Sequence, residues 1–447
     1  MNLLPVFISC FILGSSALDP KRVLLISFDG FRHDLLNGTL MPFVSRWAER
    51  STCFTNGVQS QFMTVTSPNH VSIVTGLHEE THGIVGNQFE SRALNQTFNI
   101  FSNQANVVAE SGQAKWYTGE PIWKTNEKHG GRSISMYWPT GMTAWRPTFA
   151  RQWPGPGNLT SWTKDADDLV ELFKDGRNNF AAWYFAEPDS TLHRYGFYFE
   201  DRLKAKLAEL DKMFQHTIQA LDEAGLLTTT DIILTGDHGH AEVVDRHHVV
   251  CIPGLLENRG LSADRHTAYF IYTKDDNETE AIYDTLQSAV QEEKLGMHVM
   301  KRTDLPESFF FNNSDRVGDI VIYPEIGWTV TFRCPKQSDT SPYHVSQHAH
   351  APTNSEMRAA LVMSGPSFEA GKQISEIPSN VDLYELMTYL LRLTPAPNNG
   401  TMDIVEKALK QRRSNSLQEA LVVNTEKIIP SYALVVAALV LMLIYQG

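Results

Sequence analysis

Four long apolar runs constrain the fold of this chain more than any other feature. They cover residues 23–28, 180–185, 231–235 and 359–363. Runs without polar alternation are typical of strands that are buried on both faces of a sheet. Ahead of the third run, apolar residues repeat at steps of three and four, which predicts a long amphipathic helix closed by Gly225. Strands that alternate with helices predict an α/β protein with a mainly parallel central sheet and helices on both faces.

Acidic residues follow three of these runs, and ligands of open α/β sheets bind beyond the carboxyl ends of the strands. Asp29, Asp189 and Asp237 take these places. One such acid is commonly a helix cap, but here His193 lies four residues after Asp189 and His238 directly follows Asp237. More histidines precede the fourth run, at His344, His348 and His350. Carboxylate and imidazole ligands suit zinc, and this set is large enough for two ions.

A hydroxyl-rich stretch at residues 66–77 predicts the start of a helix. Thr66 and Ser67 stand directly before Pro68, which predicts that Pro68 opens the helix and that a hydroxyl residue caps it. Backbone N–H groups at such an end favour an anion. On this stretch alone, a plain capped helix is the simpler interpretation. Beside two metal ions, however, the hydroxyl becomes a candidate nucleophile for a displacement at phosphorus.

Together these motifs resemble the ecto-nucleotide pyrophosphatase/phosphodiesterase family of the alkaline phosphatase superfamily. The matching blocks lie at residues 25–32, 68–70, 72–77, 82–84, 87, 187–189, 193, 195–196, 237–239, 365–366, 368 and 397–401. They span roughly Lys21 to Thr401, and their combination is specific. The resemblance implies an alkaline-phosphatase-like α/β fold and a short, membrane-anchored member with one catalytic domain.

The resemblance also implies roles for individual residues. Thr66 resembles the nucleophile, and Asn87 resembles the side chain that hydrogen-bonds a phosphate oxygen of the substrate. Two Zn²⁺ ions are implied as cofactors. The implied ligands of one ion are Asp189, His193 and His348, and those of the other are Asp29, Asp237, His238 and Thr66.

The chain departs from the family pattern at the residue after the nucleophile. Nucleotide-cleaving members carry an aromatic residue there that stacks on the base, whereas this chain has Ser67. Aromatic stacking contributes on the order of 1–3 kcal/mol per base. We expect Trp153, or alternatively Trp145, to supply an aromatic face for the substrate from the other side.

A second departure concerns the last metal ligand. The glycine that follows this histidine in the family is Ala349 here. His348 is the expected ligand because its spacing to the fourth run fits the family, and His350 is the alternative.

The ends of the chain predict an exported protein. Residues 1–17 read as a cleaved secretory signal. Residues 18–405 are the predicted catalytic ectodomain and residues 406–427 a juxtamembrane stalk. The apolar tail at residues 428–447 is either a short single-pass membrane anchor or a GPI signal. We therefore expect the protein on the extracellular face of the plasma membrane, held there by its C-terminal end.

Glycosylation and cysteine content fit this placement. The Asn-x-Ser/Thr sequons lie at Asn37, Asn95, Asn158, Asn277, Asn312 and Asn399. Outside the predicted signal, the chain has Cys53, Cys251 and Cys334. An odd number allows one disulfide with one free thiol, or a pairing between chains.

The expected function is extracellular hydrolysis of phosphodiester or pyrophosphate bonds in nucleotides such as ATP, NAD and dinucleoside polyphosphates. The products would be nucleoside 5′-monophosphates, formed through a covalent threonine intermediate. A net charge of −13 argues against binding of nucleic-acid duplexes. The alternatives are a phospholipase C-like or choline-phosphodiester activity, and a cell-surface interaction module that kept the fold and lost the chemistry.

Overall fold

The computed structural model describes residues 21–141, 143–152, 154–197, 200–334 and 345–411. The predicted signal, most of the stalk, the C-terminal tail, Trp153 and His344 lie outside the described residues. Contacts divide the chain into a large unit, Met1–Ala408, and a short unit, Leu409–Gly447. Among the described residues, no helix is both long and apolar enough to span a bilayer.

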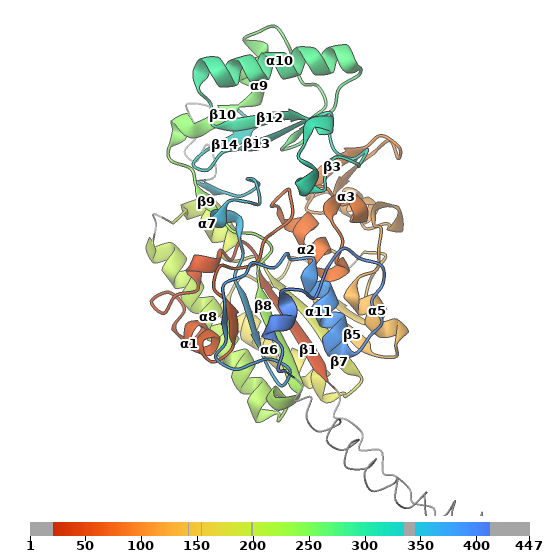
Figure 1. Cartoon of the computed structure of the whole chain (residues 1–447), viewed down its shortest axis with the longest axis vertical. Helices are drawn as coiled ribbons and strands as arrows, with labels where there is room; N and C mark the ends of the chain where they lie inside the picture. Colours follow the sequence, from red (N-terminus) through yellow and green to blue (C-terminus); the bar gives the residue numbers. More distant parts are fainter. Residues whose placement is uncertain (1–20, 142, 153, 198–199, 335–344, 412–447) are drawn as a thin grey trace, which may run out of the picture. The chain divides into compact units, whose positions relative to one another are not determined.

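A mixed eight-stranded sheet forms the centre of the large unit, in the order β17-β2-β16-β8-β1-β7-β5-β6 (Figure 1). The strands run over β1 (Arg22–Phe28), β2 (Thr52–Phe54), β5 (Arg132–Met136), β6 (Phe149–Arg151), β7 (Asn178–Phe185), β8 (Thr230–Thr235), β16 (Leu361–Ser364) and β17 (Gln373–Ile374). β1 pairs in parallel with both β7 and β8, and it is buried along its whole length. The predicted mainly parallel sheet is thereby confirmed.

The fourth predicted strand, β16, runs against its neighbours. It pairs antiparallel with both β8 and β2. An antiparallel strand begins at the edge where its parallel neighbours end. The residues just before β16 therefore lie beside the carboxyl ends of β1 and β8, which explains how a histidine cluster upstream of this strand reaches that edge.

Helices cover both faces of the sheet (Figure 1). On one face lie α1 (Pro42–Glu49), α6 (Leu159–Lys174) and α8 (Glu200–Glu223), and on the other lie α2 (Thr66–Thr75), α5 (Ile122–Lys128) and α11 (Asp382–Leu391). The predicted amphipathic helix is α8, whose apolar stripe packs into the core with Leu24, Ile26 and Phe28 of β1. The residues of β1 that alternate with these three point to the opposite face, where Ser27 contacts His70 of α2.

The helix at Thr66 begins earlier than the sequence predicted. Thr66 is its first residue, Val65 occupies the N-cap position, and no side chain caps it. Pro68 is consequently the third helical residue, where its missing N–H is still harmless because the first four N–H groups of a helix have no intrahelical partner. The predicted hydroxyl cap is therefore wrong.

A smaller antiparallel sheet lies within the same unit. It contains β11 (Phe270–Ile271), β13 (Ile320–Pro324) and β12 (Met297–Lys301), with a separate pair formed by β10 (Val249–Cys251) and β14 (Thr329–Thr331). The helices α9 (Ile252–Glu257) and α10 (Asp276–Glu293) complete a core of their own. Cys251 and Cys334 form a disulfide in this region, whereas Cys53 is a buried free thiol.

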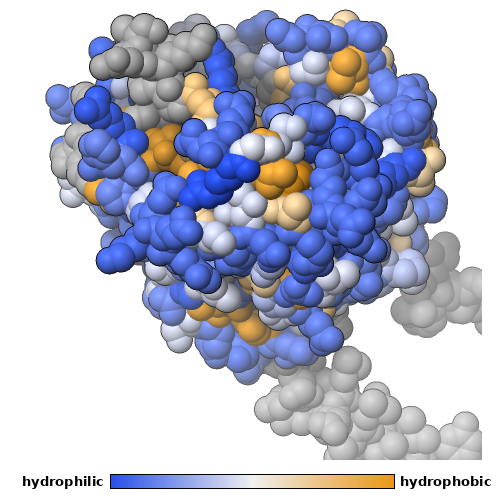
Figure 2. Space-filling model, turned by 90° about the horizontal axis from the view of Figure 1, so that it is seen from above, coloured by the Kyte–Doolittle hydropathy of each residue, from blue (hydrophilic) through white to orange (hydrophobic). Residues whose placement is uncertain are grey.

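Shorter elements connect these layers. They are α3 (Glu79–His82), β3 (Gln88–Ser91), β4 (Gln96–Asn99), α4 (Ala105–Ser111), α7 (Asp189–Tyr195), β9 (Ala241–Glu242) and β15 (Ser346–Gln347). The side chains of the six sequon asparagines are exposed or half-buried, as attachment of a glycan would require. Figure 2 shows a mostly hydrophilic face on which hydrophobic residues form small, separated patches.

Candidate metal centre

Three carboxylates meet at the edge where β1, β7 and β8 end. Asp29 directly follows β1, Asp189 opens α7 after β7, and Asp237 lies two residues beyond β8. Backbone hydrogen bonds fix their relative positions. The Asp189 N–H donates to the Asp29 carbonyl oxygen at 3.0 Å, and the Gly30 N–H donates to Asp237 Oδ1 at 3.0 Å. The sheet topology thus brings together acids from three distant parts of the chain.

One ligand group consists of Asp29, Asp237 and His238. One potential ligand atom from each lies within 4.8 Å of those of the other two. His238 Nε2 is 3.1 Å from Asp237 Oδ2 and 3.6 Å from Asp29 Oδ1. All three side chains are buried. The family resemblance implies these three residues, together with Thr66, as one of its two ligand sets.

A second ligand group consists of Asp189, His238, His240 and His348, whose ligand atoms all lie within 4.8 Å of one another. His193 falls outside this group but also lies beside the Asp189 carboxylate. Its Oδ1 lies 3.3 Å from His193 Nε2, 3.8 Å from His348 Nε2 and 2.6 Å from His240 Nε2. The first two histidines are those implied by the resemblance. His240 was missed, although it stands in the run Asp-His-Gly-His that was singled out for its first two residues.

The loop before β16 delivers His348 to this group. The strand β15, which directly precedes His348, pairs antiparallel with β9, and the Ala349 N–H donates to Thr64 O at 3.0 Å. Ala349 has φ +70°, a conformation that glycine adopts without strain. This positive φ gives a physical reason why the family pattern has a glycine at this position. His350 is buried but belongs to neither ligand group within the described residues.

The hydrogen bonds of the histidines test whether these residues fit a cation. His193, His238 and His348 each place Nδ1 within 3.0 Å of a backbone carbonyl oxygen. A carbonyl only accepts, so Nδ1 carries the proton and Nε2 presents a lone pair to the carboxylates. Among the described residues, buried Asp29 Oδ1, Asp237 Oδ2 and His238 Nε2 have no hydrogen-bond partner. Acceptors that converge on acceptors in a buried site suit a bound cation.

Burial controls the protonation of these groups. It raises the pKa of Asp237 to about 8, and together with the charge of Asp237 it raises the pKa of Asp29 well above its usual range. Burial lowers the pKa of His238 to about 3 and that of His240 to about 4, so both imidazoles are neutral at pH 7. Burial alone would raise the pKa of Asp189, but the adjacent histidines hold it well below its usual range.

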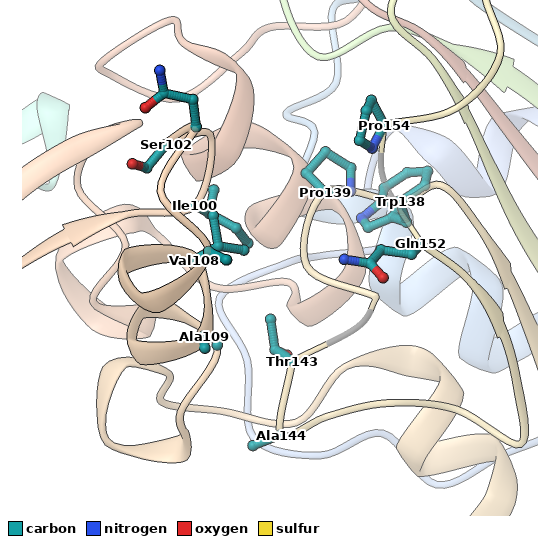
Figure 3. Close-up of a pocket in the computed structure, with 13 residues that line it drawn as sticks. Ile100, Ser102, Val108, Ala109, Trp138, Pro139, Thr143, Ala144, Gln152 and Pro154 are labelled. Carbon is teal, nitrogen blue, oxygen red and sulfur yellow. The ribbon is translucent and has the colours of Figure 1, made fainter.

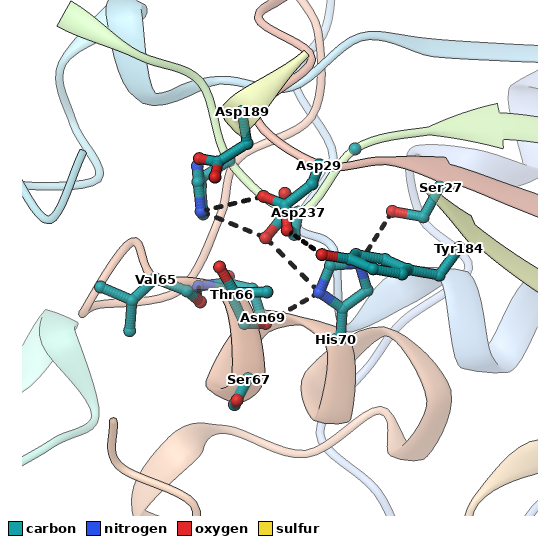
Figure 4. Close-up of polar contacts among 12 residues, drawn as sticks. Ser27, Asp29, Val65, Thr66, Ser67, Asn69, His70, Tyr184, Asp189 and Asp237 are labelled. Carbon is teal, nitrogen blue, oxygen red and sulfur yellow. Dashed lines mark hydrogen bonds and ion pairs between the residues drawn. The ribbon is translucent and has the colours of Figure 1, made fainter. Parts of the chain in front are cut away.

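Two supporting residues were not foreseen from the sequence. Tyr184 on β7 donates its hydroxyl to Asp29 Oδ2 at 2.6 Å. His70 on α2 donates from Nδ1 to Thr66 O at 2.8 Å and lies 3.4 Å from Asp237 Oδ2 (Figure 4). Tyr184 thus orients the Asp29 carboxylate, and His70 links the first turn of the helix that carries Thr66 to Asp237. Their only sequence signal is position, since one ends an apolar strand and the other lies one turn after Thr66.

Thr66 lies opposite the three carboxylates, as Figure 4 shows. It is 6 % exposed, at the start of a helix whose N-terminal end favours an anion. The neighbouring Ser67 is fully buried, and its hydroxyl has no partner among the described residues. The Ser67 N–H donates to Asn87 Oδ1 at 2.8 Å. This bond fixes the Asn87 amide next to Thr66 and leaves its NH₂ group as a potential donor.

A pocket of about 570 Å³ is lined by residues from two segments, 100–112 and 138–154 (Figure 3). Trp138 lines it and also donates its indole N–H to His70 O at 3.3 Å. The pocket is further lined by Gln152 and Pro154, the residues on either side of Trp153, which itself lies outside the described residues. Trp145, the alternative aromatic, is half-buried against Tyr117.

The comparisons with known proteins agree with this fold. A model of the type I phosphodiesterase / nucleotide pyrophosphatase family matches residues 23–351. The chain therefore belongs to the type I phosphodiesterase / nucleotide pyrophosphatase family, as its motifs predicted.

Individual relatives extend over nearly the whole chain. Bis(5'-adenosyl)-triphosphatase enpp4 of Mus musculus is 29 % identical over 423 residues, which cover 91 % of this chain and 86 % of the relative. Family member 7 of the ectonucleotide pyrophosphatase/phosphodiesterases from Rattus norvegicus is 26 % identical, with 93 % of each chain covered.

A solved structure shares the fold. It is the murine ectonucleotide pyrophosphatase/phosphodiesterase 5, in an inactive form with a threonine-to-alanine substitution and in complex with AMP. Its TM-score is 0.76 at 27 % sequence identity, and the match covers 87 % of this chain and all of that chain. The alkaline-phosphatase-like fold is thereby confirmed.

Proposed function

We propose that this protein is an extracellular, metal-dependent phosphodiesterase that cleaves phosphodiester and pyrophosphate bonds in nucleotides and releases nucleoside 5′-monophosphates. ATP, NAD and dinucleoside polyphosphates are the candidate substrates. The observation that carries the proposal is the position of Thr66, at the start of α2 and opposite three buried carboxylates. The mouse relative named for bis(5'-adenosyl)-triphosphate cleavage and the AMP complex of the solved relative support a nucleotide substrate.

In this proposal two Zn²⁺ ions are the cofactors. Asp189, His193 and His348 would hold one, and Asp29, Asp237 and His238 the other, with Thr66 completing it. When bound, such ions lower the pKa of an oxygen nucleophile and neutralise charge on the phosphoryl group. Tyr184 would keep Asp29 oriented, and His70 would keep Asp237 oriented, through their contacts to these carboxylates.

The residues around Thr66 would share the remaining work. Thr66 Oγ would give up its proton to solvent and attack the phosphorus, and the leaving oxygen would depart with the electron pair of the broken P–O bond as the threonine ester forms. Water then attacks the same phosphorus, which releases the nucleoside monophosphate and restores the threonine hydroxyl. Asn87, fixed by its hydrogen bond from Ser67 N, is placed to donate its NH₂ group to a phosphate oxygen. Loss of one such donor typically lowers turnover about 10²–10³-fold.

A choline-phosphodiester activity of the phospholipase C type is the second candidate. The observation that favours it is Ser67, which offers no aromatic face and is buried beneath the site. Chromogenic esters of thymidine 5′-monophosphate and of phosphocholine, compared on the purified protein, separate the two candidates. We expect the nucleotide ester to be the better substrate. Preference for the phosphocholine ester would reject the nucleotide assignment.

Metal dependence separates both enzymes from a silent interaction module. We expect chelation to abolish hydrolysis and added zinc to restore it. Asp237→Asn should be severely impaired, because it removes a charge from one ligand set. Full activity in strong chelator would reject the metal-dependent mechanism, and a zinc-free purified protein without hydrolase activity would favour the interaction module.

We also propose that the enzyme faces the outside of the cell. The predicted signal, sequons and apolar tail motivate this placement, and the relatives' names describe ectonucleotide enzymes. Intact cells should hydrolyse added substrate. Release by phosphatidylinositol-specific phospholipase C would indicate a GPI anchor, and its failure to release activity would favour a single-pass anchor. Activity detected only after lysis would contradict the proposal.

A further inference from the structure

His240 lies closer to the Asp189 carboxylate than any other histidine of the described cluster. Its Nε2 atom is 2.6 Å from Asp189 Oδ1, compared with 3.3 Å for His193 and 3.8 Å for His348. The side chain is fully buried, and its ligand atom lies within 4.8 Å of those of Asp189, His238 and His348. The ligand sets implied by the sequence give this imidazole no role.

The hydrogen bonds of His240 assign its tautomer. Its Nδ1 lies 3.1 Å from Ser346 Oγ, and that hydroxyl donates its own proton to Ala241 O at 3.0 Å. Ser346 must therefore accept from His240, so Nδ1 carries the proton and Nε2 directs its lone pair at Asp189. Two acceptors repel each other at 2.6 Å unless a cation is shared between them. A ring nitrogen bonded to an oxygen on the far side is the usual arrangement of a metal-binding histidine.

The surrounding backbone holds the ring in this position. Arg32 Nη1 donates to His240 O at 2.7 Å. Gly30, with φ +67°, packs so closely that a Cβ at this residue would lie 2.8 Å from His240 Cδ2 and 3.0 Å from Asp189 Cβ. A larger residue at position 30 would push the imidazole and the carboxylate apart. The site is thus preorganised around the contact between His240 and Asp189.

We propose that His240 is a fourth protein ligand of the ion held by Asp189, His193 and His348. The inference rests on the two-metal centre of the proposed function. Zinc sites with four protein ligands are closed, whereas catalytic zinc sites keep one position open. His240 would therefore hold this ion more tightly, and the substrate would reach it only by displacing a ligand or by expanding the coordination to five.

Metal binding to the full-length protein tests this role without reference to activity. Affinities of both sites for Zn²⁺ are measured by competition with a chromophoric chelator, and the absorption spectrum of the Co²⁺-loaded protein reports coordination number. His240→Ala should weaken one of the two sites at least about tenfold. The absorption bands of its Co²⁺-loaded form should shift in position, because a water molecule would replace an imidazole ligand. His247→Ala, an exposed histidine on the same segment, should change neither.

His240→Gln separates a metal ligand from a hydrogen-bond donor. Its amide can still donate to Asp189, so wild-type affinity in this variant would overturn the inference. If His240→Ala folds poorly, Ser346→Ala takes its place, because it keeps the ring and removes the acceptor of the Nδ1 proton. We expect a smaller but measurable loss of affinity at one site, and unchanged affinity would again overturn the inference. A wild type that binds no metal would reject the proposed function, whereas two wild-type sites that are insensitive to His240 would reject the fourth ligand alone.

Discussion

Removal of the metals should give the folded protein an unusual dependence on pH. Burial raises the pKa of Asp237 to about 8 from an ordinary value of 3.8, and the pKa of Asp29 is raised in the same direction. The metal-free folded state therefore binds more protons than the unfolded chain between these values, so stability is lost as the pH rises. His238 and His240, whose pKa values are lowered by burial, have the opposite effect, but only below about pH 6.5, where the unfolded chain gains their protons. Burial alone would also lower the pKa of His193, but the adjacent Asp189 raises it overall, so His193 acts in the same direction as the carboxylates.

The window between pH 7 and 8 lies above the range in which the histidines with lowered pKa values change their protonation. One extra bound proton corresponds to about 1.4 kcal/mol per pH unit. Since Asp237 would be mostly protonated at pH 7 and about half protonated at pH 8, it alone should lower the free energy of unfolding by about 1 kcal/mol over this interval. Asp29 adds to the same trend. The zinc-loaded protein should show no such fall, because bound metal replaces the protons.

Urea unfolding at pH 7.0, 7.5 and 8.0, with chelator or with zinc, measures this difference. Asp237→Asn is the matched control, since it removes the titrating group and relieves Asp29 of a neighbouring charge. Its metal-free form should show a shallower slope than the metal-free wild type. Equal or greater stability of the chelated wild type at pH 8 would refute the reasoning that the carboxylates are protonated when metal is absent.

Three substitutions test the surroundings of the centre. Tyr184→Phe removes the donor to Asp29 and should weaken zinc binding at one site by about 10–100-fold, measured by chelator competition. Asn87→Asp keeps the acceptor for Ser67 N but replaces the NH₂ donor with a negative charge, so turnover of a nucleotide ester should fall at least about 100-fold. Ser67→Ala removes a buried hydroxyl without a partner, so it should keep most turnover and change the free energy of unfolding by no more than about 1 kcal/mol. Normal turnover in Asn87→Asp, unchanged zinc affinity in Tyr184→Phe, or inactivity of Ser67→Ala would each contradict the role given to that residue.

The carboxylates of the centre could be predicted because they follow a simple rule. Asp29, Asp189 and Asp237 end or follow strands buried on both faces, and parallel strands present their carboxyl ends at one edge. The long helix α8 could be predicted equally well, since its apolar residues repeat regularly. These features depend on local sequence and on one topological rule, so they need no knowledge of distant contacts.

Other parts of the site depend on contacts that no local pattern encodes. The proposed role of His240 rests on its contacts with Asp189 and Ser346, which lie 51 and 106 residues away. The antiparallel direction of β16 is invisible in an apolar run, which reads the same in either direction. The prediction that a hydroxyl residue caps the helix at Pro68 was wrong, because the helix begins two residues before Pro68, at Thr66.

Covalent labelling of the nucleophile decides whether Thr66 attacks the phosphorus. A nucleotide ester is mixed with the enzyme, the reaction is quenched in acid, and the labelled peptide is mapped by mass spectrometry. We expect a nucleotidyl group on Thr66, and no label in Thr66→Ala even though this variant keeps its fold and its zinc. A label on Ser67, or turnover retained by Thr66→Ala, would contradict this expectation.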